Sequence, residues 1–221
     1  MSPSTVYITG NKMQVSQDAN AIWLYDGVGT LKAVVSGNTL TADSTCTAAW
    51  EAEGWCYNAP TVEWYSSVVV SYSLINVVLS LNTIFGGATG STSANGVYVI
   101  GGPGQVSGNT VTGSYIGIWV DAATVVQAVA THNRPRWRGH PVFSSSSSAI
   151  TPSHNVLVTG NVIKNSAEYG IALTHGSSDN VITGNVIMKS GVFDLYWDQT
   201  GTGNVWTADV CMTSSPPGLC T

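Results

Sequence analysis

A six-residue phrase that recurs near the C-terminus constrains this chain more than any other feature. It reads Val-Thr-Gly-Asn-Val-Ile at 158–163, Ile-Thr-Gly-Asn-Val-Ile at 182–187 and Gly-Thr-Gly-Asn-Val-Trp at 201–206. Short alternating segments separate the copies, namely Tyr-Gly-Ile-Ala-Leu at 169–173 and Phe-Asp-Leu-Tyr-Trp at 193–197. A period of about 20–30 residues that holds strands and Gly-Asn corners, without a helical pattern, predicts a β-solenoid.

Weaker copies of the phrase run back to the start of the chain. The corner residues are Asn11, Asn38, Asn82, Asn109, Asn133, Asn161, Asn185 and Asn204. Their spacings are 27, 44, 27, 24, 28, 24 and 19 residues, which is one coil each if the longest holds an insertion. Asn tolerates left-handed backbone and can hydrogen-bond to identical side chains in neighbouring coils. We therefore predict an Asn ladder through about seven or eight coils.

The repeat resembles that of the right-handed parallel β-helix proteins, because both read V-x-G-N-x-I followed by Y-G-I-x-L. The sub-group with this pattern includes NosD-like periplasmic proteins and the mannuronan C5-epimerases, and the wider superfamily includes polysaccharide lyases and glycosidases. The resemblance implies an all-β, right-handed parallel β-helix, a single-stranded β-solenoid with a long disulfide-stapled insertion. The motifs specify the coil and leave the chemistry open.

The catalytic motifs of these relatives do not occur in the sequence. Mannuronan epimerases and related lyases typically carry Asp-Pro-His on a strand, and polygalacturonases carry paired Asp and Gly-His-Gly. Their catalytic assignments therefore do not transfer, and a site must be argued from the residues of this chain.

Composition narrows the class of partner. Only 9% of the 221 residues are charged and the net charge is −5, which argues against a nucleic-acid ligand. No apolar run approaches transmembrane length, so we expect no membrane insertion. The four His show no metal-ligand spacing, so we predict no cofactor, and calcium is not indicated by the sequence.

The four Cys form two pairs that are close in sequence, Cys46 with Cys56 and Cys211 with Cys220. Two small disulfide loops are the favoured interpretation, and they predict a secreted, periplasmic or cell-surface protein. We expect a β-helix domain over 1–206, with insertions at 41–67 and 133–143, and a stapled tail or cap over 207–221. No element before Val6 is recognisable as a cap for the first coil, so we expect a missing N-terminal portion, self-association that puts another subunit over the end, or a larger role for residues 1–5.

Strand alternation places an aromatic column on the outside of the predicted coils. In Ile-Gly-Ile-Trp-Val-Asp (116–121) the branched residues should face the core, which leaves Gly117, Trp119 and Asp121 outside. The equivalent middle positions give the column Trp23, Tyr98, Trp119, Ala172 and Tyr196. Such a stripe could stack sugar rings, or the rings could pack on one another as a stabilising ladder.

Both insertions are predicted between an Asn corner and the following strand. The first carries Trp50, Trp55 and Trp64 beside the Cys46–Cys56 loop, with several acidic residues. The second, which we call the Arg bulge, holds Arg134, Arg136, Trp137, Arg138 and His140 and follows His132. Equivalent positions on different coils project from one edge, so we predict that the insertions form the walls of a groove roughly 15 Å wide.

The Arg bulge carries the clearest chemical signal, because it holds every Arg in the chain. Guanidinium groups bind carboxylate or sulfate bidentately, and a His near a uronate can act as a base once the carboxylate is neutralised. The predicted catalytic residues are His140, His132, Asp121 and Arg136. The predicted substrate-binding residues are Trp23, Tyr98, Trp119, Tyr196, Arg134, Arg138, Trp137, Trp50, Trp55 and Trp64. The alternative is a solvated loop whose Arg residues pair with acidic neighbours.

Other ionisable residues are weaker candidates. Asp194 and Asp198 lie on one predicted strand with their carboxyl groups about 13 Å apart, too far for the usual acid and nucleophile of a glycosidase. His175 ends a strand, and we assign it a structural role, with a place in the groove wall as the alternative.

The sequence as a whole predicts an extracytoplasmic protein that binds or processes a polysaccharide. We expect a lyase or related carbohydrate-active enzyme on acidic glycans. The alternative is a non-catalytic structural or adhesive module, a segment of a surface protein or fibre. Ice binding is a third class, which requires regular outward Thr ranks, whereas the outward columns are expected to be aromatic and mixed.

Overall fold

The computed structural model describes residues 4–16, 20–25, 32–43, 67–72, 76–87, 94–121 and 153–221. Within these ranges the regular structure is entirely β-strand, and every strand pairs in parallel with its neighbours. The strands form three sheets of seven, six and seven strands, which we name A, B and C.

Each sheet takes every third strand of the chain as far as the sixth circuit, and the last circuit adds one strand each to sheets A and C. Sheet A consists of β1 (Thr5–Thr9), β4 (Lys32–Ser36), β7 (Asn76–Ser80), β10 (Gly104–Ser107), β13 (Val156–Thr159), β16 (Val181–Thr183) and β19 (Val205–Thr207). Sheet B consists of β2 (Lys12–Ser16), β5 (Thr39–Asp43), β8 (Thr83–Phe85), β11 (Thr110–Thr112), β14 (Val162–Lys164) and β17 (Val186–Met188). Sheet C consists of β3 (Ile22–Tyr25), β6 (Ser67–Tyr72), β9 (Asn95–Ile100), β12 (Ile116–Asp121), β15 (Tyr169–Thr174), β18 (Phe193–Trp197) and β20 (Ser214–Ser215).

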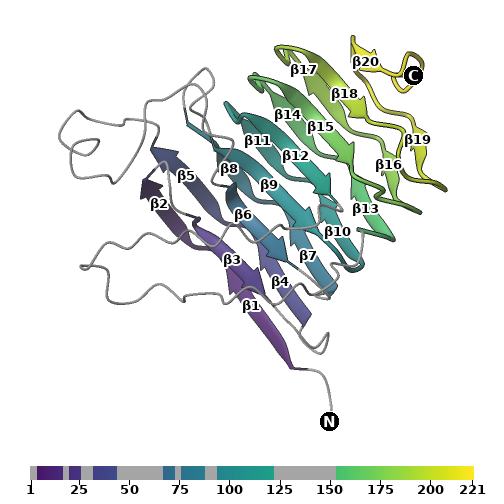
Figure 1. Cartoon of the computed structure of the whole chain (residues 1–221). Helices are drawn as coiled ribbons and strands as arrows, with labels where there is room; N and C mark the ends of the chain where they lie inside the picture. The colour runs from purple at the N-terminus through teal and green to yellow at the C-terminus, as the bar shows by residue number, and fades with distance from the viewer. Residues whose placement is uncertain are drawn as a thin grey trace, which may run out of the picture.

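The chain therefore winds through sheets A, B and C in turn and repeats the circuit seven times (Figure 1). The seventh circuit contributes β19, a single bridge from Val210 to Val186 on the edge of sheet B, and β20. An all-β parallel solenoid of this size confirms the predicted fold and the predicted number of coils.

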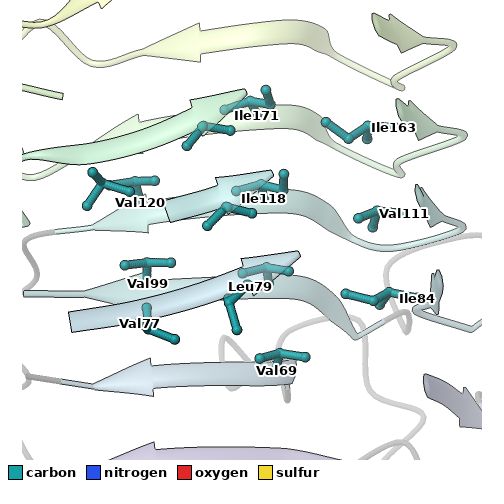
Figure 2. Packing of buried hydrophobic residues seen from close by; sticks show 14 of the residues in the cluster. Val69, Val77, Leu79, Ile84, Val99, Val111, Ile118, Val120, Ile163 and Ile171 are labelled. Carbon is teal, nitrogen blue, oxygen red and sulfur yellow. The ribbon is translucent and has the colours of Figure 1, made fainter. Parts of the chain in front are cut away.

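The core fills the interior between the three sheets with branched aliphatic side chains. Equivalent positions on successive coils stack on one another: Ile84, Val111 and Ile163 from sheet B lie one above the next (Figure 2). Ile118 and Ile171 stack in the same way on sheet C (Figure 2). All five are at most 1% exposed. Each coil thus buries its apolar residues against one another and against those of the adjacent coils, which is how a solenoid builds a continuous core.

A ladder of amide side chains runs along the corner between sheets A and B. Its rungs are Asn11, Asn38, Asn82, Asn109, Asn161, Asn185 and Asp209. At each step the backbone N–H and the Nδ2 of one Asn donate to the side-chain oxygen of the next, at 2.8–3.0 Å. From Asn38 to Asn185, Nδ2 also donates to the carbonyl three residues before the preceding rung. The predicted ladder exists.

Two predicted rungs were wrong. Asn109 donates directly to Asn161, and β10, β11 and β12 pair with β13, β14 and β15, so no coil with a corner at Asn133 lies between them. Asn204 is not the last rung, because Asp209 accepts from Asn185. Asn204 instead accepts from Asn180 in a second, shorter ladder before sheet A.

Two long stretches separate consecutive strands, one between β5 and β6 and one between β12 and β13, and they lie at different corners of the coil. The first follows β5 and ends at β6, between sheets B and C, whereas residues 122–152 follow β12 and precede β13, between sheets C and A. The prediction that both insertions occupy the same place in the coil was therefore wrong. Their described ends lie at opposite ends of the strands of sheet C.

The outer surface of sheet A differs from the expectation that outward columns are aromatic and mixed. One outward column carries a hydroxyl on every coil: Thr9, Ser36, Ser80, Ser107, Thr159, Thr183 and Thr207. Ser80 Oγ donates to Ser36 Oγ at 3.1 Å, and Thr183 and Thr207 share a 3.0 Å hydrogen bond. These bonds make the column a polar ladder that links neighbouring coils.

The tail covers the open end of the last coil. Cys211 and Cys220 form a disulfide, as predicted, and both pack against the core together with Trp206 and the buried Leu219. The buried Asp194 carboxylate accepts from the backbone N–H groups of Met212 and Thr213, which joins the tail to β18.

Leu81 occupies a corner position that glycine fills on most coils. The residue before the ladder rung has positive φ on each coil and is Gly at 10, 37, 108, 160 and 184, but Leu81 (φ 56°) on the third coil and Ala208 (φ 54°) on the seventh. A side chain in this conformation costs about 1–2 kcal/mol, and Leu81 is 69% exposed, so it recovers little by burial. We expect Leu81→Gly to raise the free energy of unfolding by about 0.5–1 kcal/mol after the added chain entropy of Gly is subtracted. Urea unfolding measures this change, and a lower midpoint would mean that packing of the Leu81 side chain outweighs the strain.

Asp209 ends the Asn ladder with a group that cannot donate when it is ionised. Its Oδ1 accepts from Asn185, but its Oδ2 is buried without a hydrogen-bond partner among the described residues. Burial raises the pKa of Asp209 above its ordinary value of 3.8, although the hydrogen bonds from Asn185 oppose the shift. Following the rule of the other rungs, an amide at 209 would donate to the carbonyl of Ile182.

We therefore expect Asp209→Asn to stabilise the protein by about 1 kcal/mol at pH 7. Because the folded pKa is raised, the carboxylate is destabilising above that pKa, and this penalty disappears as the pH falls through it toward 3.8. The gain should therefore shrink in acid. Unfolding of both proteins at pH 7 and near pH 4 measures this, and an equal gain at both values would contradict the assignment to ionisation.

Candidate functional site

The predicted aromatic column lies on sheet C with the predicted register. Trp119 pairs with Tyr98 on one side and with Ala172 on the other, and Ala172 pairs with Tyr196. The Tyr98 and Trp119 rings lie 4.5 Å apart at an interplanar angle of 30°. Trp23 is 56% exposed, but it pairs with Val70. Val70 lies on β6, a strand that the predicted column omitted, and it pairs in turn with Tyr98. The column is therefore interrupted between Trp23 and Tyr98.

A second aromatic group continues the surface on the C-terminal side. Tyr196 stacks on Tyr169 with ring centroids 4.3 Å apart, and Phe193 lies 6.5 Å from Tyr196. Burial, followed by the neighbouring Glu168, raises the pKa of Tyr169 to about 12, so its hydroxyl stays protonated at neutral pH. Ala172 is buried beside these rings. Sheet C thus presents two aromatic pairs on its outer surface, separated by one small residue.

Asp121 ends β12 at the edge of this surface and is fully buried, although alternation predicted an outward, accessible side chain. Its Oδ2 accepts from the Tyr98 hydroxyl at 2.6 Å. Its Oδ1 accepts from Thr174 Oγ1 at 2.9 Å and lies 2.7 Å from His175 Nδ1. These neighbours come from the two coils on either side of Asp121 and cover the carboxylate, which explains why it points outward and is nevertheless buried.

His175 lies directly after β15 and carries the accessible part of the cluster. Its φ of 53° turns the chain sharply, and its ring contacts Asp121 while 60% of its side chain stays exposed. On the opposite side its backbone N–H donates to Asp198 Oδ2 at 2.7 Å. Asp198 is itself held by the backbone N–H and hydroxyl of Thr200. Coils on both sides therefore fix the position of His175.

This arrangement is a buried carboxylate that orients an exposed imidazole. A carboxylate can only accept, so His175 Nδ1 carries the proton in the neutral ring and Nε2 keeps its lone pair. Such a pair can remove a proton from a substrate. Asp121 itself is poorly placed as a nucleophile, because both of its oxygens accept hydrogen bonds and neither is exposed.

The described residues offer little support for other chemistry. They contain no cluster of three His, Cys, Asp or Glu that could hold a metal ion. Asp194 accepts from three backbone N–H groups, including that of Ser190, which makes it a structural carboxylate. A small hollow lies beside Lys164 and Lys189, at the corner after sheet B.

A family comparison supports the architecture. Residues 66–205, more than half of the chain, match the family described as the right-handed β-helix region. The chain belongs to the right-handed β-helix family. No curated protein and no solved structure gives a significant match to it.

Most predicted site residues of this β-helix lie outside the described residues. These are His132, His140, Arg134, Arg136, Arg138, Trp137, Trp50, Trp55 and Trp64, together with Cys46 and Cys56. The ends of the interval that contains the Arg bulge are nevertheless well placed. Asp121 is the last described residue before it and Ser153 the first after it, and Ser153 Oγ donates to the carbonyl of Asp121. The β-helix therefore holds both ends of this interval at the backbone of Asp121, the residue whose side chain binds His175.

The sequence contained a signal for the contact between His175 and Asp121, which was not predicted. Asp121 and Thr174 occupy equivalent positions on neighbouring strands of the β-helix, so a residue directly after Thr174 must lie close to Asp121. The left-handed conformation of His175, which brings its ring onto the carboxylate, could not be inferred from the repeat.

The family match leaves the cellular location open. Disulfides such as Cys211–Cys220 are typical of oxidising compartments. In the ranges that the structure describes, no helix of this β-helix protein could span a membrane.

Proposed function

We propose that this β-helix is an extracytoplasmic lyase that acts on a uronate-containing polysaccharide, with His175 as the general base. The observation that carries the proposal is the exposed imidazole held by the buried Asp121 carboxylate at 2.7 Å, beside the Tyr98–Trp119 aromatic pair. The disulfide supports the extracytoplasmic part of the proposal.

Elimination suits this cluster better than hydrolysis. Glycoside hydrolysis usually needs two carboxyl groups that reach the sugar, and Asp121 is buried behind His175. In β-elimination, His175 Nε2 would take the proton from C5 of a uronate. The C5–H electrons would form the C4=C5 double bond, and the C4–O bond would break. The released oxygen would take a proton from water, which leaves an unsaturated uronate at the new chain end.

The aromatic pairs supply a surface for the sugar rings. The faces of each aromatic pair that are turned away from the partner ring would offer apolar contacts to a sugar, and Trp119 lies beside the proposed base. The carboxylates of Asp121 and Asp198, which both bind His175, would repel an acidic sugar. The four Lys lie on or beside strands of sheets A and B, so Arg134, Arg136 and Arg138 are the proposed partners of the substrate carboxylate.

A screen of neutral and acidic polysaccharides, followed by ultraviolet absorbance of unsaturated uronates, tests the reaction. Absorbance that grows with one acidic polymer is the expected result. Binding without product would favour the non-catalytic surface module. The absence of both binding and product would reject a glycan function.

The double variant Arg136→Ala and Arg138→Ala should weaken binding of the acidic polymer in a salt-dependent way. Unchanged binding would reject the proposed role of these two residues.

A further inference from the structure

Trp119 is connected to the proposed base by a short chain of hydrogen bonds. Its indole Nε1 donates to Thr174 Oγ1 at 2.8 Å, and Thr174 Oγ1 lies 2.9 Å from Asp121 Oδ1. The same oxygen lies 2.7 Å from His175 Nδ1. Thr174 is 9% exposed, so its hydroxyl lies out of solvent between the indole and the carboxylate.

The donors and acceptors fix the direction of this chain. An indole N–H can only donate and an ionised carboxylate can only accept, whereas a hydroxyl does both with a single proton. The Trp119 N–H therefore occupies a lone pair of Thr174 Oγ1, and the Thr174 proton points to Asp121 Oδ1. A polarised hydroxyl is also the better donor, because hydrogen bonds in a chain strengthen one another.

We propose that Trp119 is a positioning residue for His175, acting through Thr174 and Asp121. The residue that stacks on Tyr98 at the outer surface also orders the carboxylate that orients the imidazole. Contact of a ligand with the Trp119 ring is thereby coupled to the geometry of His175. The consequence for catalysis rests on the proposed function, whereas the effect on the His175 ring does not.

A double-mutant cycle with Trp119→Phe and Thr174→Val tests this connection. Phe keeps an aromatic ring but has no N–H, and Val keeps the shape of Thr without the hydroxyl. The first readout is the pair of ¹⁵N shifts of the His175 ring, assigned with His175→Gln, which report its tautomer and order. The second is kcat and KM on a uronate polymer. Trp206→Phe is the matched control, because the Trp206 Nε1 is buried without a hydrogen-bond partner among the described residues.

Each single variant should raise the fraction of the His175 tautomer with the proton on Nε2, with the larger effect in Thr174→Val. Trp119→Phe should lower kcat about tenfold and leave KM within about twofold. In the Thr174→Val background, Trp119→Phe should change neither readout further, because the connecting hydroxyl is already gone.

Additive effects in the double variant would overturn the proposal, since Trp119 would then act on the sugar or the fold independently of Thr174. An unchanged His175 tautomer in Trp119→Phe would overturn it as well. If one single variant fails to fold, the ¹⁵N shifts of the His175 ring in the other single variant are compared with those in Trp206→Phe. This comparison still decides whether Trp119 positions His175. If no polymer is cleaved, the lyase proposal fails, and the ring shifts still decide whether Trp119 positions His175.

Discussion

His175→Ala is expected to lower the rate of uronate elimination by about 10²- to 10⁴-fold, the range that a positioned general base contributes. The substitution removes the nitrogen that would accept the C5 proton. It should leave the fold nearly unchanged, because most of the side chain is exposed and the backbone N–H keeps its bond to Asp198. Initial rates from ultraviolet absorbance, with thermal unfolding recorded in parallel, measure both expectations.

A control on another face separates this effect from general damage. Gln105→Ala changes a half-buried polar residue on the outer surface of sheet A and should retain wild-type rates.

Asp121→Asn, like His175→Ala, should lose most activity, because an amide no longer requires His175 Nδ1 to carry the proton. A His175→Ala variant with wild-type rates would place the base elsewhere, with His132 and His140 as the remaining sequence candidates.

Asn109→Ala is expected to lower the free energy of unfolding by about 3–5 kcal/mol, because it empties a central rung of the ladder. Asn109 is 1% exposed, accepts two hydrogen bonds from Asn82, and donates from Nδ2 to Asn161 and to the carbonyl of Leu79. Alanine removes all four bonds and leaves buried polar atoms without partners. Urea unfolding measures the loss.

Asn11→Ala is the matched control at the exposed end of the same ladder. Water can replace the bonds that its side chain makes, so we expect a change below about 1 kcal/mol. A loss at Asn109 as small as the loss expected at Asn11 would show that the β-helix tolerates an empty rung. The ladder would then contribute to register more than to stability.

The sequence predicted those parts of the fold that each coil repeats in the same residue type. The rungs from Asn11 to Asn185 were recognisable because an amide must both donate and accept at every step. Asn133 was misleading because its spacing imitates one coil, and spacing alone does not distinguish a corner from an insertion. Asp209 escaped notice because the last rung needs only to accept, so a different residue type can fill it.

The candidate site was only partly predictable for a related reason. Trp119, Tyr98 and Asp121 lie on strands, where alternation and register assign a neighbour to every residue. His175 lies one residue beyond a strand, where a single backbone angle decides its direction. Its contact with Asp121 spans 54 residues of sequence, which no local pattern reports.

The joined ends of the interval between Asp121 and Ser153 have a consequence for how this scaffold could be reused. The chain leaves the coil after Asp121 and returns at Ser153, which is hydrogen-bonded to Asp121. The length of the segment between them therefore does not change the register in which β12 pairs with β15. Evolution or an engineer could therefore exchange that segment for another of different length while the amide ladder and the Asp121–His175 pair stay in place. If the proposed function holds, substrate preference could then change independently of the proposed base.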